Sequence, residues 1–409
     1  MVRGFYIILA AQFFSSLGDN ILLFAAIALL KMLNAPAWQT PVLQQFFVFA
    51  FIVLAPFVGP FSDALPKGQV MFISNALKLV GCAAMLAGIH PLLAYGLVGV
   101  GSAMYSPAKY GILAEYLPSH RLVWANGWME GLTVAAIILG AILGGLLISQ
   151  SVGSQMVDFL KQLPFNAGID TVPEAAIALV LIVYGIAALV NLYIPKLPIE
   201  HRLAKKPTVS FLIKDFWQSL LALWQDPLGQ VSLAVTSLFW GAGTTLRFII
   251  LAWAAVALNL DLAKATQLTA VVAIGLAIGS VVAAKAVVLE HAVKVLPMGM
   301  LMGLLVMAMV WVTDWRIAIV MLILIGAVAG GFVIPMNALL QHRGHQLMGS
   351  GHSIAVQNFN ENIAILIMLG VYAQMVNAAL SANTIVLIFG LFIFCAMGLL
   401  SKIHGHDQD

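Results

Sequence analysis

The feature that most constrains this chain is a series of long apolar stretches separated by short polar breaks. A helix needs about 20 apolar residues to cross the hydrocarbon core of a bilayer. Because unpaired backbone groups are costly in lipid, each stretch is expected to be a helix. Only 9% of the 409 residues are charged, whereas 62% are hydrophobic. The sequence therefore predicts an all-α polytopic membrane protein with 12 transmembrane helices, at about 4-32, 41-62, 69-89, 91-114, 121-149, 173-194, 229-258, 267-288, 294-312, 316-340, 352-377 and 381-401.

The distribution of Lys and Arg predicts how these helices are oriented. If the N-terminus is placed inside, twelve of the basic residues in loops and at span ends fall on that side, and only Lys31, Lys161, Lys264 and Arg316 fall on the other. Cytoplasmic loops carry the excess of positive charge, so both termini are expected in the cytoplasm. The first stretch is too long for a typical cleaved signal segment and is expected to stay as an anchor. The net charge of +3 then reflects topology, and no nucleic-acid partner is expected.

A long basic connector divides six apolar stretches from six. The expected organisation is an N-terminal six-helix bundle at 1-195, a cytoplasmic linker at 196-228 and a C-terminal six-helix bundle at 229-409. The halves echo each other, since "NGWMEG" in the fifth stretch answers "NFNENI" in the eleventh and aligns Glu130 with Glu361. Two repeats of six helices in one orientation are the internal symmetry of major facilitator transporters.

Six charged residues lie inside the apolar stretches. Each costs about 2.5 to 3.5 kcal/mol at a helix centre, so all six facing lipid would cost roughly 15 to 20 kcal/mol. They are expected to face protein or water, and three acids with three bases allow pairing without net buried charge. Structural ion pairs that only hold helices together are the alternative, and Lys78 fits that interpretation best. The six are Asp19, Lys78, Lys109, Glu130, Arg247 and Glu361.

Neighbours at helical spacing extend these charges into polar faces. Asn126 precedes Glu130 by one turn, and Gln357 precedes Glu361 by one turn. Such faces in both halves favour a polar pathway with a central cavity. Glycines at four-residue spacing, such as Gly326 and Gly330, are expected to let helices pack closely.

The segment "GPFSDALPKGQV" lies between the second and third stretches. An Asp near a helix end can cap backbone N–H groups and pair with bases. We therefore expect Gly59, Asp63 and Lys67 to form a latch that stabilises one conformation. The alternative is a solvated turn around Pro66 and Gly68.

Several segments resemble the bacterial lysophospholipid transporter family of the major facilitator superfamily. They are "SSLGDNILLFAAIALLK", "GPFSDALPKGQVMFISNALKLVG", "YSPAKYGILAE", "TSLFWGAGTTLRF" and "IPMNALLQHRG" followed by "IAVQNFNEN". The similarity covers nearly the whole chain in the same order. Two departures are a longer polar segment at about 150-172 and Asn360 in place of an expected glycine beside Glu361.

This resemblance implies a flippase-like role in the inner membrane of a Gram-negative bacterium. Lysophosphatidylethanolamine and lysophosphatidylglycerol would move inward for reacylation by a cytoplasmic acyltransferase/acyl-ACP synthetase. Arg247 suits the phosphate because it offers two donors, and Asp19 or Glu361 suits the ammonium. Asp19 itself is expected to pair with Arg247 or Lys109. The full set of expected substrate-binding or translocation residues is Asp19, Asn20, Lys109, Glu130, Arg247, Gln357, Asn358 and Glu361.

Three other functions are weighed against this one. A proton-coupled major facilitator transporter of a small soluble compound or drug would use the same carboxylates as proton carriers. A membrane enzyme is disfavoured because no nucleophile motif, acyltransferase motif or metal-ligand cluster appears, so no catalytic residue, metal or cofactor is expected. A channel is disfavoured because no segment resembles a selectivity filter.

Overall fold

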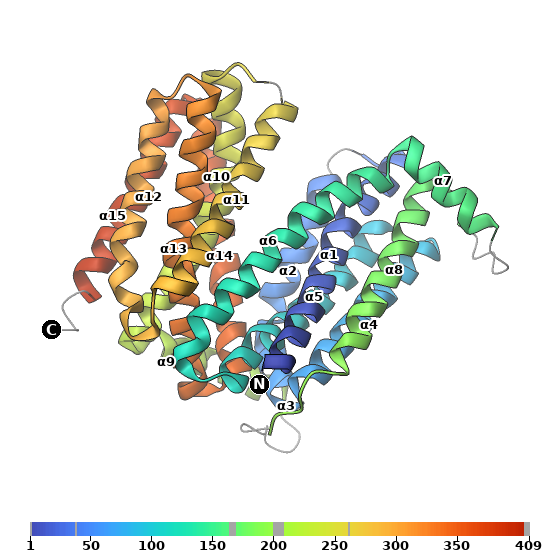
Figure 1. The fold of residues 1–409 in the computed structure, drawn as a ribbon, viewed down its shortest axis with the longest axis horizontal. Coiled ribbons are helices and arrows are strands. Elements are labelled where there is room, and N and C mark those ends of the chain that lie inside the picture. Colours follow the sequence, from blue (N-terminus) through green and yellow to red (C-terminus); the bar gives the residue numbers. More distant parts are fainter. Residues whose placement is uncertain (1, 37–38, 163–168, 199–207, 261, 405–409) are drawn as a thin grey trace. The chain divides into compact units, whose positions relative to one another are not determined.

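The computed structural model describes residues 2–36, 39–162, 169–198, 208–260 and 262–404. Within these residues the regular structure is entirely helical (Figure 1). The helices are α1 (Val2–Met32), α2 (Gln39–Val53), α3 (Ala55–Ala64), α4 (Lys67–Leu86), α5 (Pro91–Tyr116), α6 (Leu122–Leu147), α7 (Gln150–Lys161), α8 (Val172–Asn191), α9 (Val209–Gln225), α10 (Pro227–Ala257), α11 (Leu262–Ala286), α12 (Leu296–Ala308), α13 (Trp315–Met348), α14 (Ser350–Asn377) and α15 (Ala382–His404), with short 3₁₀ turns η1 (Ser119–Arg121), η2 (Leu289–Val295) and η3 (Met309–Trp311).

Every predicted membrane span corresponds to a helix or to a pair of consecutive helices. In the described part of the chain, ten helices are long and apolar enough to cross a membrane, and the bent pair α2 and α3 makes an eleventh if it counts as one span. The predicted span at 91-114 is formed by α5, which has 26 residues but is not among these helices. The all-α fold class predicted from the sequence is confirmed.

The predicted second span is not one continuous helix. Its two parts, Val42–Val53 and Ala55–Ala64, meet at an angle of 65°. Pro56 opens α3 and lacks the N–H that a continuous helix would use there, which explains the break at Leu54. At the other end Leu65 is extended, as expected for a residue before proline, so α3 stops at Ala64. Asp63 is thereby placed in the last turn of a short helix.

Two helices lie in segments that the sequence predicts to be a loop or a connector. α7 occupies much of the polar segment after α6, and the Ser149 hydroxyl accepts a bond from Val152 N at its start. α8 then begins with a capping box between Thr171 and Glu174. α9 occupies the second half of the predicted linker and buries Phe216, whereas Trp217 is half exposed.

The chain divides into two compact units. Unit 1 comprises Met1–Ile112, Ala135–Phe216 and Gly349–Ala355, and unit 2 comprises Leu113–Val134, Trp217–Met348 and Val356–Asp409. Helices α5, α6, α9 and α14 therefore each contribute residues to both units. The division into bundles at 1-195 and 229-409 stays a prediction.

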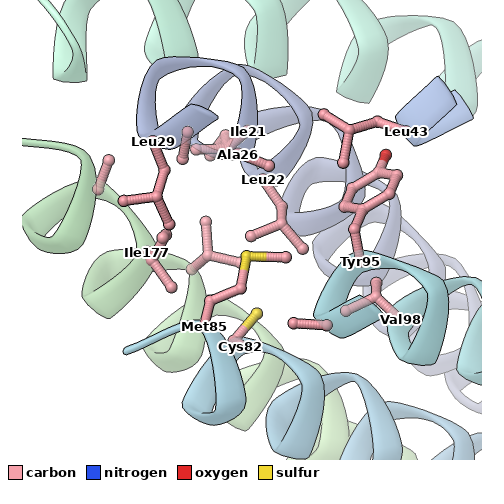
Figure 2. Close-up of a cluster of buried hydrophobic side chains, with 14 of the residues drawn as sticks. Ile21, Leu22, Ala26, Leu29, Leu43, Cys82, Met85, Tyr95, Val98 and Ile177 are labelled. Atoms are coloured by element: carbon pink, nitrogen blue, oxygen red, sulfur yellow. The ribbon is translucent and has the colours of Figure 1, made fainter. Parts of the chain in front are cut away.

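The core of unit 1 is an apolar cluster around α1. α1 and α4 both pack against α8. Figure 2 shows Leu22 of α1 facing Met85 and Cys82 of α4, with Ile177 of α8 beside them. Tyr184 of α8 belongs to the same cluster and is fully buried.

The core of unit 2 depends on a close approach of α11 and α13. α13 also packs against α10 and α12, and α12 packs against α15. A methyl group on Gly279 of α11 would collide with the backbone of Ala327 on α13, and one on Gly326 would collide with the backbone of Val272 on α11. Small residues permit this backbone contact between membrane helices, which confirms the packing role predicted for Gly326.

The contact predicts opposite effects of two glycine substitutions. Alanine favours a helix over glycine by about 1 kcal/mol, and nothing lies near an added methyl group at Gly145. We expect Gly145→Ala to keep or raise the melting temperature in detergent. Gly279→Ala should lower it, since overpacking a tight contact costs about 1 to 3 kcal/mol. Equal stabilisation by both substitutions would contradict this packing.

Candidate functional site

The carboxylate of Asp19 is the centre of a polar cluster inside unit 1. Lys78 Nζ donates to both of its oxygens, at 2.8 Å and 2.9 Å, and Tyr184 Oη donates to Oδ1 at 2.6 Å. Lys78 also donates to Ser15 Oγ at 3.0 Å, and Ser15 donates to Asn75 Oδ1 at 2.8 Å. We call these five residues the Asp19 cluster. Its members come from α1, α4 and α8, the helices whose packing builds the core of this unit.

The two charges of this cluster differ in exposure. The side chain of Lys78 is 1% exposed, whereas that of Asp19 is 22% exposed. The ammonium of Lys78 lies 5.1 Å from the ring centre of Tyr105 and 5.4 Å from that of Tyr184. Aromatic faces attract a cation in this way. Lys78 is thus enclosed, and Asp19 is the more accessible member of the pair.

This pairing differs from the one expected from the sequence. Asp19 pairs with Lys78, which is neither of the two bases expected for it. Lys78 was interpreted as a structural charge, and Tyr184 was not singled out at all. The ion pair is also structural, because a lysine this deeply buried needs an anion close by. The carboxylate of Asp19 nevertheless stays partly exposed, whereas Lys78 is enclosed.

The latch residues predicted from the segment after α2 lie together. Lys67 Nζ bonds Asp63 Oδ1 at 2.6 Å, and the side chains of both are almost fully buried. Asp63 also accepts backbone bonds from Gly351 N at 2.8 Å and His352 N at 3.0 Å, at the start of α14. A carboxylate at a helix N-terminus satisfies N–H groups that have no partner within the helix. Asp63 and Lys67 are therefore buried in a hydrogen-bonded contact, whereas the solvated turn would leave them exposed.

Gly59 lies where α3 approaches the first turn of α14. A methyl group there would come within 3.0 Å of His352 Cα and 3.1 Å of Ala355 Cβ. On the other side of this contact, a methyl group on Gly351 would meet the carboxylate of Asp63. Both glycines are therefore needed for Asp63 to reach the backbone of α14.

Unit 2 contains a second polar cluster, at Glu361. Gln357 Nε2 donates to Glu361 Oε1 at 2.7 Å and to Asn337 Oδ1 of α13 at 2.9 Å. The carboxylate of Glu361 is buried, and the negative charge of Glu130 acts on it. The amide placed one turn before this glutamate thus binds it directly.

The corresponding amide on α6 behaves differently. Asn126 and Gln341 of α13 exchange two side-chain hydrogen bonds, each of 2.8 Å. Gln341 lies one turn after Asn337, so α13 presents two amides in succession to neighbouring helices. Asn126 thus bonds an amide of α13, whereas Gln357 also bonds the acid of its own helix, and Glu130 is buried.

The other expected site residues lie in less defined surroundings. Asn20 turns back and donates to Ser16 O at 2.8 Å. Lys109 is buried, with its ammonium 4.3 Å from the ring centre of Tyr110. Asn358 is buried on α14. Arg247 is exposed on α10 and makes no ion pair with any residue that the structure describes.

Asn360, which replaces an expected glycine, does not change the hydrogen bonds of Glu361. Its amide donates to Val356 O at 2.8 Å, and its oxygen accepts from Trp224 Nε1 of α9 at 3.3 Å. The substitution instead ties α14 to α9 within unit 2.

The ion pair predicts a characteristic pattern of stability. Lys78→Met leaves the carboxylate of Asp19 without its cation, and breaking such a buried pair costs about 3 to 5 kcal/mol. Adding Asp19→Asn should restore part of this loss, because no unpaired charge then remains. Thermal unfolding in detergent measures both effects.

The control for this series is the exposed pair of Lys161 and Asp170, whose atoms are 3.5 Å apart. Lys161→Met should cost less than about 1 kcal/mol. A double variant of Asp19 and Lys78 no more stable than Lys78→Met alone would show that the two charges are not coupled.

Comparison with known proteins assigns the family. A profile of the Major Facilitator Superfamily matches residues 8–360. The lysophospholipid transporter LplT of Yersinia enterocolitica is 44% identical over 375 residues, which cover 91% of this chain and 87% of that protein. The protein of the same name from Klebsiella pneumoniae is 42% identical over 403 residues, 97% of this chain and 95% of that protein.

Solved structures agree on the fold. The major facilitator transporter FucP in its outward conformation gives a TM-score of 0.76 at 15% identity, with 98% of each chain covered. The human organic anion transporter MFSD10 gives 0.71 at 14% identity, with 97% of this chain and 99% of that one covered. The relatives are transporters by name and not enzymes. With a profile match over most of its length and relatives above 40% identity, this multi-pass membrane protein belongs to the lysophospholipid transporter family of the Major Facilitator Superfamily.

Proposed function

We propose that this protein moves lysophospholipids from the outer to the inner leaflet of a bacterial inner membrane by alternating access. The observation that carries the proposal is the identity of 42% and 44% to lysophospholipid transporters along nearly the whole chain. The substrates are lysophosphatidylethanolamine and lysophosphatidylglycerol. Each has a phosphate and a single acyl tail, so the protein must offer charged groups to the headgroup while the tail stays in apolar surroundings.

The Asp19 cluster suits exchange of partners with a phosphate. Lys78 and Tyr184 together direct three hydrogen bonds at the carboxylate of Asp19. A phosphate that approaches the exposed side of Asp19 competes for these donors, and it repels the aspartate. Arg247 is exposed and presents a planar pair of donors that matches phosphate geometry. Lys109 is the further cation along the proposed path.

The ammonium of an ethanolamine headgroup requires acceptors. The carboxyl group of Glu361 receives a hydrogen bond from the neutral amide of Gln357 and keeps further acceptor capacity for an ammonium. Asn20, Gln357 and Asn358 add neutral donors and acceptors that suit glycerol hydroxyl groups. These residues form the proposed headgroup path.

The latch at Gly59, Asp63 and Lys67 is proposed to stabilise one conformation of the transport cycle. Support comes from the four hydrogen bonds that Asp63 receives from Lys67, from two backbone N–H groups and from the His352 ring. Opening the latch would expose the first turn of α14 and leave these N–H groups without partners. The cost of losing these bonds stabilises the closed arrangement.

The setting of this activity follows from the charge distribution. The excess of Lys and Arg on the side of the N-terminus supports cytoplasmic termini. Delivered lysophospholipid would then be available to a cytoplasmic acyltransferase/acyl-ACP synthetase, the proposed functional partner, which restores the missing acyl chain. Membrane lipid surrounds the helices throughout.

Uptake of labelled lysophosphatidylethanolamine by cells without endogenous lysolipid transport tests the function. We expect uptake to depend on this protein, and to fall at least about tenfold in Asp19→Asn and Arg247→Ala, since losing one charge-assisted contact costs about 1.5 to 3 kcal/mol. Lys161→Ala is the matched control, because Lys161 is an exposed cation on α7. Absence of uptake with correctly inserted wild-type protein would refute the proposal.

A second candidate is proton-coupled transport of a small soluble compound. It is favoured by the buried carboxylate of Glu361, to which Gln357 donates and on which Glu130 acts electrostatically. A buried acid beside a second acid is suited to carry a proton. This candidate predicts that transport in proteoliposomes stops when the pH gradient is collapsed and that Glu361→Gln abolishes the dependence. Lysophospholipid uptake that is unchanged without a gradient would exclude it.

A further inference from the structure

We infer that His352 is a positioning residue of the latch and that its doubly protonated ring ties the first turn of α14 to both α3 and α9. This inference rests on the proposed function, because it assigns a pH-dependent control to the transport cycle. This histidine lies at the end of a predicted span and belongs to no metal or catalytic motif, so its role could not be predicted from the sequence.

The imidazole ring of His352 lies between two carboxylates. Its Nδ1 is 2.6 Å from Asp63 Oδ2, and its Nε2 is 3.0 Å from Asp215 Oδ2. A neutral imidazole carries one N–H and donates to only one of them, whereas the imidazolium donates to both. The geometry therefore matches the charged ring.

The charge balance favours the same state. The charged groups that face the ring are Asp63 of α3 and Asp215 of α9, and Lys67 of α4 bonds Asp63 from the other side. With a charged His352, the two carboxylates face two cations and the group is neutral. With a neutral His352, one negative charge is left over among side chains that are 3%, 4% and 12% exposed at Lys67, Asp63 and His352. Asp215 is 31% exposed and bonds no other side chain in the described chain.

The two bonds of the ring have different consequences when the proton leaves. Asp63 keeps its bonds from Lys67 and from the N–H groups of Gly351 and His352 in either state. A neutral ring that still donates to Asp63 turns a lone pair toward Asp215, and two acceptors then face each other. Loss of the proton therefore releases α9 first and leaves the cap on α14 in place.

The helix α14 belongs to both units, and His352 lies in the part that belongs to unit 1. Residues 349–355 belong to unit 1 together with Asp63 and Asp215, whereas α14 continues into unit 2 from Val356. The His352 bridge is thus part of what holds the first turn of this helix to unit 1. Histidine is the side chain whose charge changes most readily within the pH range of cells, so this attachment can respond to pH.

The test measures the accessibility of this turn across pH. Ser353 is fully buried in the first turn of α14, and Cys82 is buried whereas Cys395 is exposed. Purified full-length protein with Ser353→Cys and Cys395→Ser is labelled with N-ethylmaleimide at several values of pH from about 5 to 8, the range over which histidine titrates. At each pH, the labelling rate is divided by the labelling rate of the same protein that also carries Asp215→Asn. This ratio cancels the pH dependence of the reaction of the thiol with N-ethylmaleimide.

Asp215→Asn is informative because an amide accepts from the charged ring and donates to the neutral one, so its bridge survives either state. We expect the ratio to rise at least about fivefold from pH 5 to pH 8, and to stay constant when His352→Gln is added to both proteins. His291→Gln, at an exposed histidine of η2, should leave the rise unchanged. A constant ratio in the protein that retains His352 would overturn the inference.

Uptake of lysophosphatidylethanolamine separates this inference from the proposed function. If labelling depends on pH and on His352 but no variant transports the lipid, the bridge stands and the proposed function fails. If the lipid is transported but the labelling ratio is constant, the function stands and His352 has only a structural role.

Discussion

The rest of this structure depends on the cost of a positive charge in the apolar interior of unit 1. Lys78 is 1% exposed, and an unpaired ammonium there would be several kcal/mol less stable than in water. Asp19, Tyr184 and Ser15 supply what the ammonium and its partner need, and they come from α1 and α8. The helices that pack to form the apolar cluster in Figure 2 are thus the same ones that bring the charges together. Packing and charge pairing specify one arrangement of α1, α4 and α8.

Unit 2 contains an ion pair between Arg343 and Asp226, and its buried polar side chains on α6, α13 and α14 bond through amides. Amides on α13 bond amides on α6 and α14, and the acid Glu361 is held by Gln357. An amide satisfies donors and acceptors at lower desolvation cost than a charge. The contrast gives the two units different chemistry: one presents a cation already occupied by an aspartate, and the other presents a carboxylate with a neutral partner.

The extent to which the sequence predicted this structure follows from the range of each interaction. A membrane-spanning helix is specified by neighbouring residues, so the apolar stretches predicted the helices. Pro56 explains why the second predicted span is broken into two helices. Lys67 and Asp63 are four residues apart, so their bond could be predicted from the motif that contains both. Lys78 and Tyr184 are 59 and 165 positions from Asp19, and helical periodicity identifies a face but not the residue opposite it. The bonds of His352 were out of reach for the same reason. α9 is different: "VSFLIKDFWQSLLALWQ" repeats apolar residues every three or four positions, a signal that the basic charge of the connector obscured.

We propose that the pair of Asp19 and Lys78 contacts the headgroup and does more than hold helices together. The most direct test is a charge swap, Asp19→Lys with Lys78→Asp, in which an ion pair persists but its negative member is the enclosed one. Native mass spectrometry of the purified protein would count bound lysophosphatidylethanolamine in the wild type and in the swap, with the melting temperature as the measure of folding. We expect a folded swap variant that has lost the bound lipid. A folded swap variant that binds the lipid as the wild type does would show that the pair is structural only.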